Sequence, residues 1–90
     1  MIRFYVDPAT GLPHIHDHGV TEEEVEFVLA TSSDDRRGRD DSRVCEGQTA
    51  GGRYLRIIYV PDDDGEGLFV ITADPIQGRG RRAHRRRRNR

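Results

Sequence analysis

The sequence has no lysine, a single cysteine and no long apolar run among its 90 residues. One cysteine, Cys45, cannot form a disulfide within the chain, so a disulfide-stapled secreted fold is not expected. No charged and then apolar leader is seen, and no stretch is apolar enough to suggest a membrane span. These absences predict a protein of the reducing cytoplasm.

Apolar residues in general are scarce. They make up 33% of the chain, and the mean hydropathy is −0.82. A chain of 90 residues is long enough for one compact domain and too short for two. We predict a single domain with a thin core over residues 1–78, followed by a basic C-terminal tail over residues 79–90.

The net charge of −1 conceals a strong division along the chain. All 16 acidic residues and 7 of the 15 basic ones precede the tail. The tail holds the remaining basic residues and no acid; these are Arg79, Arg81, Arg82, Arg85, Arg86, Arg87, Arg88 and Arg90. Guanidinium groups this close repel one another unless anions are near, so the tail predicts salt-dependent binding to RNA or other nucleic acid.

Other interpretations of the tail remain open. It can fold back on the acidic domain, it can meet an acidic partner protein such as an antitoxin, or it can have no specific partner. A membrane partner is not expected, because the tail has no large apolar side chain to insert.

The first part of the chain predicts a strand and a short helix. Residues 1–6 alternate apolar and polar side chains, as a strand with one buried face does. Residues 13–18 begin with a proline and are followed by Gly19, an arrangement typical of a helix of one or two turns.

A second helix is signalled more strongly. Thr21 and Glu24 have the spacing of a capping box, and Val20 and Val25 the spacing of its hydrophobic staple. The helix should therefore begin directly after Thr21 and end near residue 31.

The rest of the domain predicts a loop and three strands. Residues 32–42 contain no apolar side chain and predict a solvated loop. Two strands joined by a short turn at residues 50–52 follow, the second over residues 53–60, and after an acidic turn at 61–67 a third strand covers 68–73. The fold class is therefore α+β, with two helices on one face of an antiparallel sheet.

A tight turn at residues 50–52 would fix which side chains share a face of the hairpin. It places Arg43, Tyr54 and Arg56 together on the open face, and Val44, Leu55, Ile57 and Tyr59 against the helix. Arginines grouped in this way could bind a phosphodiester, while the tyrosine stacks on a base or moves a proton. The alternative is ordinary packing of charged side chains on a solvated sheet face.

Histidines raise the possibility of a metal site, because His14, His16 and His18 would lie on one side of a strand, and the first and last of them on one side of a helix. Zinc would still need Cys45, His84 or a carboxylate as a further ligand. We expect no metal, and we consider one of the histidines a better candidate for a general base. Cys45 has no activating motif and should be a small strand residue. Residues 62–65 do not fit a calcium loop.

Several short motifs together resemble a known family. A strand ends in Asp7-Pro8, the segment HGVTEEEV spans residues 18–25, the segment GRYL spans residues 52–55, and ITA spans residues 71–73. Over roughly residues 4–73 the chain resembles the BrnT-like branch of the RelE superfamily of bacterial toxins, and a closely similar bacterial domain family of unassigned function. The family tends to carry an arginine after its ITA-like strand, where this chain has Asp74 and Pro75.

This resemblance implies a RelE-like fold and a toxin-type endoribonuclease that a cognate antitoxin neutralises. It matches His18 and Gly19 to a basic residue followed by glycine at a helix end, and Arg53 to the arginine that opens the long strand. Our hypothesis is cleavage without metal or other cofactor, in which Arg43, Arg53 and Arg56 bind phosphate and His18 or Tyr54 assists proton transfer. The alternatives are a non-catalytic protein that binds RNA or DNA through its tail, and a small interaction protein with an acidic partner.

Overall fold

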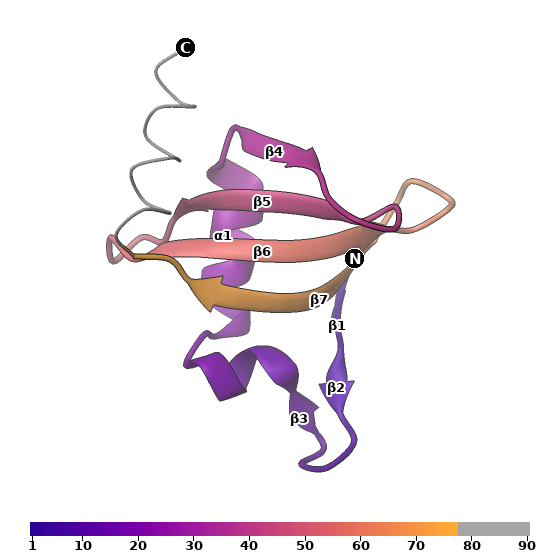
Figure 1. Cartoon of the computed structure of the whole chain (residues 1–90), viewed down its shortest axis with the longest axis horizontal. Helices are drawn as coiled ribbons and strands as arrows, with labels where there is room; N and C mark the ends of the chain where they lie inside the picture. Colours follow the sequence, from indigo (N-terminus) through magenta and orange to yellow (C-terminus); the bar gives the residue numbers. More distant parts are fainter. Residues whose placement is uncertain (78–90) are drawn as a thin grey trace.

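The computed structural model describes residues 1–77 and shows a small α+β fold built on a mixed five-stranded sheet (Figure 1). The strand order is β1 (Ile2–Phe4), β7 (Leu68–Pro75), β6 (Tyr54–Pro61), β5 (Arg43–Gln48) and β4 (Asp34–Arg37). β1 pairs parallel with β7, and the other neighbours pair antiparallel. The arginine-rich tail, with the eight arginines from Arg79 to Arg90 that we predict to bind nucleic acid, lies outside the described residues.

The helix α1 (Glu22–Thr31) begins and ends where the sequence predicts. Thr21 caps its first turn: its backbone N–H donates to Glu24 Oε1 at 3.0 Å, and the Glu24 backbone N–H donates to Thr21 Oγ1 at 3.2 Å. Both partners of the predicted staple, Val20 and Val25, are buried. α1 covers one face of the sheet and is, within residues 1–77, the only α-helix; no helix there is long and apolar enough to cross a membrane.

The expected first helix is a single 3₁₀ turn, η1 (His14–His18). It ends at Gly19, whose φ of 71° lies in the left-handed region, as the predicted helix-end glycine requires. Its one buried side chain, Ile15, packs at β7, so η1 covers an edge of the sheet and does not form a second helix of the layer. The prediction of two helices on one face is therefore replaced by one α-helix and this short turn.

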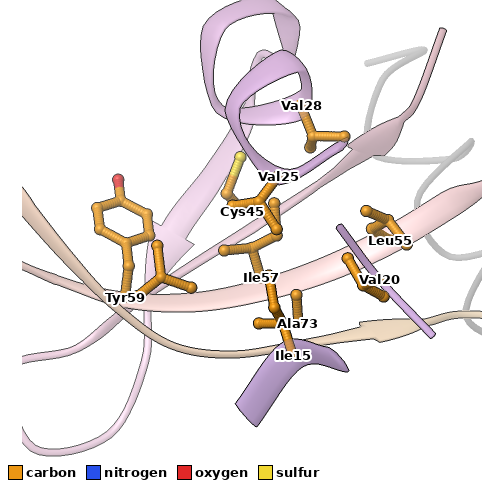
Figure 2. Packing of buried hydrophobic residues seen from close by; sticks show 10 residues of the cluster. Ile15, Val20, Val25, Val28, Cys45, Leu55, Ile57, Tyr59 and Ala73 are labelled. Atoms are coloured by element: carbon orange, nitrogen blue, oxygen red, sulfur yellow. The ribbon is translucent and has the colours of Figure 1, made fainter. Parts of the chain in front are cut away.

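The core lies between α1 and the middle strands. Figure 2 shows Val25 and Val28 of α1 directed toward β5 and β6, with Ile15 of η1 beside Ala73 of β7. The buried cluster consists of Ile15, Val20, Val25, Val28, Cys45, Leu55, Ile57, Tyr59, Val70 and Ala73. This is a small core, as expected from the low apolar content of the chain.

The solvated loop predicted for residues 32–42 is wrong in its first half, where β4 forms the edge of the sheet. β4 reads DDRR, a pattern without any apolar residue. It holds its place by charge: Asp35 accepts from Arg43 at 2.7 Å, and Arg36 reaches Glu46 at 3.1 Å. Charged side chains at a sheet edge also deter pairing with another chain.

The predicted turn of the hairpin is also wrong, and the error reverses the faces of β5. Gln48 pairs with Tyr54, so five residues, 49–53, connect β5 to β6. Because side chains alternate between faces, this places Arg43 opposite Tyr59, on the face that α1 covers. Arg56 and Tyr54 stay on the open face, but Glu46 and not Arg43 lies beside them.

The N-terminal strand is shorter than predicted. β1 ends at Phe4, and its parallel pairing with β7 makes the sheet mixed where an antiparallel one was expected. Val6 is 48% exposed and belongs to β2 (Val6–Asp7), which pairs with β3 (Leu12–Pro13) in a separate small hairpin. This hairpin leads the chain away from the sheet and into η1 (Figure 1).

Gly47 sets how closely α1 approaches β5, and it gives a test of the packing. A Cβ added there would lie 2.8 Å from Ser32 Cβ and 3.1 Å from Val28 Cγ1. We expect Gly47→Ala to lower the free energy of unfolding by about 1–3 kcal/mol, the usual effect of overpacking, although alanine is otherwise the better strand residue. Urea denaturation measures the change.

The control is Gly51→Ala in the hairpin turn, where the nearest atom to an added Cβ is Thr49 Oγ1 at 3.9 Å. The free energy of unfolding of this variant should be close to that of the wild type. Equal stability of the two variants would contradict the close approach of α1 to β5.

Candidate functional site

A hollow of about 620 Å³ lies where the end of η1, the β5–β6 turn and the end of β7 meet. It is lined by His18, Gly19, Gly52, Arg53, Tyr54, Pro75, Ile76 and Gln77. Three residues that the sequence singles out as catalytic candidates, His18, Arg53 and Tyr54, are thus brought together from distant segments. A second hollow, of about 340 Å³, between α1 and β5 is lined by no titratable side chain, so it is the poorer candidate for chemistry.

Arg53 stands at the rim of the larger hollow and links the turn to the start of α1. Its Nη1 donates to the Gly19 carbonyl at 3.1 Å and lies 3.7 Å from Glu24 Oε2. The side chain is 45% exposed, so part of the guanidinium still faces solvent. The position holds a positive charge in a fixed place beside His18.

His18 has an acidic partner that the sequence analysis did not assign to the site. Its Nδ1 lies 2.9 Å from Asp74 Oδ1, at the end of β7. A carboxylate beside Nδ1 favours the tautomer with a proton on that nitrogen, which leaves a lone pair on Nε2. In the sequence, Asp74 stands out only because it occupies the place after the ITA segment where the resembled family tends to have arginine. That difference alone does not indicate a contact with His18.

Arg56 lies on the open face next to Tyr54, but its charge is already paired. Its Nε donates to Glu46 Oε2 at 2.7 Å, and Arg36 Nη2 donates to the same oxygen at 3.1 Å. Burial raises the pKa of the Glu46 carboxyl, but the hydrogen bonds from Arg56 and Arg36 outweigh this effect, and the pKa is lowered overall. Glu46 is therefore a buried anion shared by two arginines.

Arg43 does not join this group. It lies on the other face of β5, where its Nε donates to Asp35 at 2.7 Å and Asp35 also accepts from the Tyr59 hydroxyl. Burial, together with the hydrogen bond to Asp35, raises the pKa of Tyr59 to about 12. The predicted grouping of Arg43, Tyr54 and Arg56 is therefore wrong, because the hairpin register differs by one residue.

Cys45 is a residue of the strand β5, as the sequence predicts, and it is buried. Burial is the main cause that raises the pKa of its thiol to about 11. Because the thiolate is the reactive form, Cys45 is not a nucleophile at neutral pH.

The three histidines of η1 do not converge on one point. His16 Nε2 lies 2.7 Å from Glu22 Oε1, and this hydrogen bond is the main cause that lowers the pKa of Glu22. His14 and His18 instead face each other, with their Nε2 atoms 3.3 Å apart. His84, considered above as a further ligand, lies outside the described residues.

Comparison with known proteins adds no relative to this picture. No protein-family model, no curated protein and no solved structure matches the chain. The site must therefore be interpreted from its own geometry and chemistry.

The Glu46 cluster gives a prediction about stability and pH. Glu46→Gln keeps the shape of the side chain but removes the charge that Arg36 and Arg56 share. We therefore expect the free energy of unfolding to fall by about 1.5–3 kcal/mol at neutral pH, the range for hydrogen bonds to charged groups. Since the pKa of Glu46 is lowered in the folded state, its contribution is present above the ordinary glutamate pKa and is lost as the pH falls through the folded value. Urea unfolding of both proteins at neutral and acidic pH tests this.

The difference in the free energy of unfolding between the wild type and Glu46→Gln should be smaller at acidic pH than at neutral pH. Glu26→Gln on the exposed side of α1 is the control and should change stability little at either pH. A Glu46→Gln effect that is the same at both values would mean that the charge of Glu46 does not stabilise the fold.

Proposed function

We propose that this protein is a metal-independent endoribonuclease of the RelE and BrnT type, acting at the hollow beside the β5–β6 turn. The observation that carries the proposal is that His18 lines one hollow together with Arg53 and Tyr54, two neighbouring residues that lie far from it in sequence. A base and a cation are groups that serve RNA cleavage by its own 2′-hydroxyl, and an aromatic side chain serves the binding of the RNA bases.

In the proposed reaction His18 is the general base. Its Nε2, which lies 3.3 Å from His14 Nε2 in the structure, exchanges that contact for the ribose 2′-hydroxyl and accepts its proton. The 2′-oxygen then forms a bond to the adjacent phosphorus. The bond from phosphorus to the 5′-oxygen of the next nucleotide then breaks, which leaves a 2′,3′-cyclic phosphate, and the departing 5′-oxygen takes up a proton from water. Asp74, 2.9 Å from His18 Nδ1, is the positioning residue that keeps the imidazole in the reactive tautomer.

Arg53 and Tyr54 have separate roles in this proposal. The solvent-facing part of the Arg53 guanidinium binds the phosphate oxygens and stabilises their added negative charge in the transition state. Tyr54 also lines the hollow, but only 8% of it is exposed, so in this proposal it forms part of the wall against which a base of single-stranded RNA packs. Arg43 and Arg56 are left out of the catalytic set, because Asp35 and Glu46 hold their guanidinium groups.

The α+β class supports the RelE-like proposal in its coarse form, since α1 covers one face of the antiparallel strands β5, β6 and β7, although the short turn η1 stands where that layout has a second helix. In this proposal the arginine-rich tail attracts RNA to a domain whose own charge is negative. A cytoplasmic protein of this kind would be neutralised by a cognate antitoxin.

A second function has one observation in its favour. Carboxylates lie beside the basic groups: Glu24 is 3.7 Å from Arg53, and Asp74 is 2.9 Å from His18. Such acids compete with phosphate for the cations. A non-catalytic protein that binds RNA or DNA through its tail would need no free cation at the hollow.

Cleavage of a labelled single-stranded RNA at low salt in EDTA tests the first function. We expect cleavage by the wild type, a fall of about 10²–10⁴-fold in rate for His18→Gln from loss of the base, and a fall of about 10²–10³-fold for Arg53→Ala from loss of transition-state stabilisation. A gel shift measured in the same samples separates binding from cleavage.

Arg37→Ala is the matched control, because Arg37 is an exposed arginine of the edge strand β4. It should cleave as the wild type does. A salt-sensitive gel shift of the RNA without any cleavage would contradict the ribonuclease proposal and favour a non-catalytic binding protein. In cells, the ribonuclease proposal predicts that expression of the wild type arrests growth and that expression of His18→Gln does not.

A further inference from the structure

The pair of imidazoles in η1 presents two nitrogen atoms to a common point. His14 Nε2 and His18 Nε2 lie 3.3 Å apart, and the two rings meet edge to face with centroids 5.1 Å apart. Both side chains are about one-third exposed, at 34% and 36%, so an ion from solvent can reach them.

Each imidazole has acidic oxygen beside its other nitrogen. His18 Nδ1 lies 2.9 Å from Asp74, and His14 Nδ1 lies 3.6 Å from Asp17 and 3.9 Å from Asp7. Asp74 favours a proton on His18 Nδ1 and so a lone pair on its Nε2, whereas Asp17 and Asp7 lie beyond hydrogen-bond distance and act on His14 through their charge alone. In the metal-free protein one Nε2–H can donate to the other Nε2 across this 3.3 Å contact, and a metal ion bound by both nitrogens takes the place of that proton.

The spacing of the two nitrogens suits a transition-metal ion. Zinc binds imidazole nitrogen at about 2.0–2.1 Å, and two such ligands at a tetrahedral angle are about 3.3 Å apart. The distance between His14 Nε2 and His18 Nε2 has this value. Carboxylates that hold the far nitrogen of a metal-bound histidine are the usual outer ligand shell of zinc sites.

We propose that His14 and His18 bind one Zn²⁺ ion, or a similar divalent metal that prefers imidazole, through their Nε2 atoms. Asp74 and the pair Asp7 and Asp17 orient the two rings from behind, and water completes the coordination. His16, whose Nε2 is held by Glu22, takes no part.

A competing arrangement uses the same histidine in another way. Asp7, His14 and Asp17 each offer an atom, and these atoms lie within 4.8 Å of one another. An ion there would bind His14 Nδ1 and would not need His18. The two arrangements make opposite predictions for a variant of His18.

Calorimetric titration of the full-length, metal-free protein with zinc chloride tests the proposal. We expect one ion per chain for the wild type, and no measurable binding for His14→Gln or His18→Gln. Asp74→Asn keeps both imidazoles and should weaken binding by about 10–100-fold, the usual effect of losing an outer-shell carboxylate. Circular dichroism confirms that each variant is folded.

His16→Gln and His84→Gln are the controls, and both should bind zinc as the wild type does. Absence of binding by the wild type would overturn the proposal. Binding that survives His18→Gln but is lost in Asp17→Asn would overturn it in favour of the Asp7, His14 and Asp17 arrangement. The titration contains no RNA, so its outcome does not depend on whether the protein cleaves RNA.

Discussion

The close packing of α1 on β5 and β6 is the contact on which the rest of the structure depends. Val25 and Val28 supply the apolar surface, and Gly47 lets the helix come within contact of the strand. The capping box at Thr21 fixes the start of α1, and the segment before it, η1, lies against β7. At the end of this segment His18 meets Asp74, and Arg53 donates to the carbonyl of the next residue, Gly19.

Ion pairs between charged side chains stabilise parts of the sheet that this small apolar core does not reach. The edge strand β4 has no apolar residue and is joined to β5 and β6 through Asp35 on one face and Arg36 on the other. Burying the Glu46 carboxylate is costly, and it is tolerated because two guanidinium groups share it. The same arrangement removes Arg56 from the groups that can meet a phosphate, so Arg36 and Arg56 stabilise the sheet while Arg53 is left for the proposed chemistry.

Short sequence motifs correctly predicted those features of the fold that depend on contacts between near neighbours in the chain. The cap at Thr21 and the helix-end Gly19 depend on near neighbours in the chain, and both were predicted correctly. The strand β4 was missed because its stabilising partners, such as Glu46, are remote in sequence. The hairpin faces were reversed because a five-residue connection replaces the tight turn, and one residue of register moves Arg43 to the other face. Among the candidate site residues, His18, Arg53 and Tyr54 were predicted from the family resemblance and from the pattern of the strands, whereas Asp74 depends on a contact that no local pattern reveals.

His18 connects the two chemistries that we propose for this region. A general base needs the lone pair of Nε2 for a proton, and a metal ion needs the same lone pair for coordination. One imidazole nitrogen cannot do both at once, so an ion held between His14 and His18 excludes the proposed cleavage for as long as it stays bound. Asp74 serves either role without change, because in both it keeps the proton on Nδ1. The metal content of the surroundings, and not a movement of the chain, would then decide whether His18 acts as a base or as a ligand.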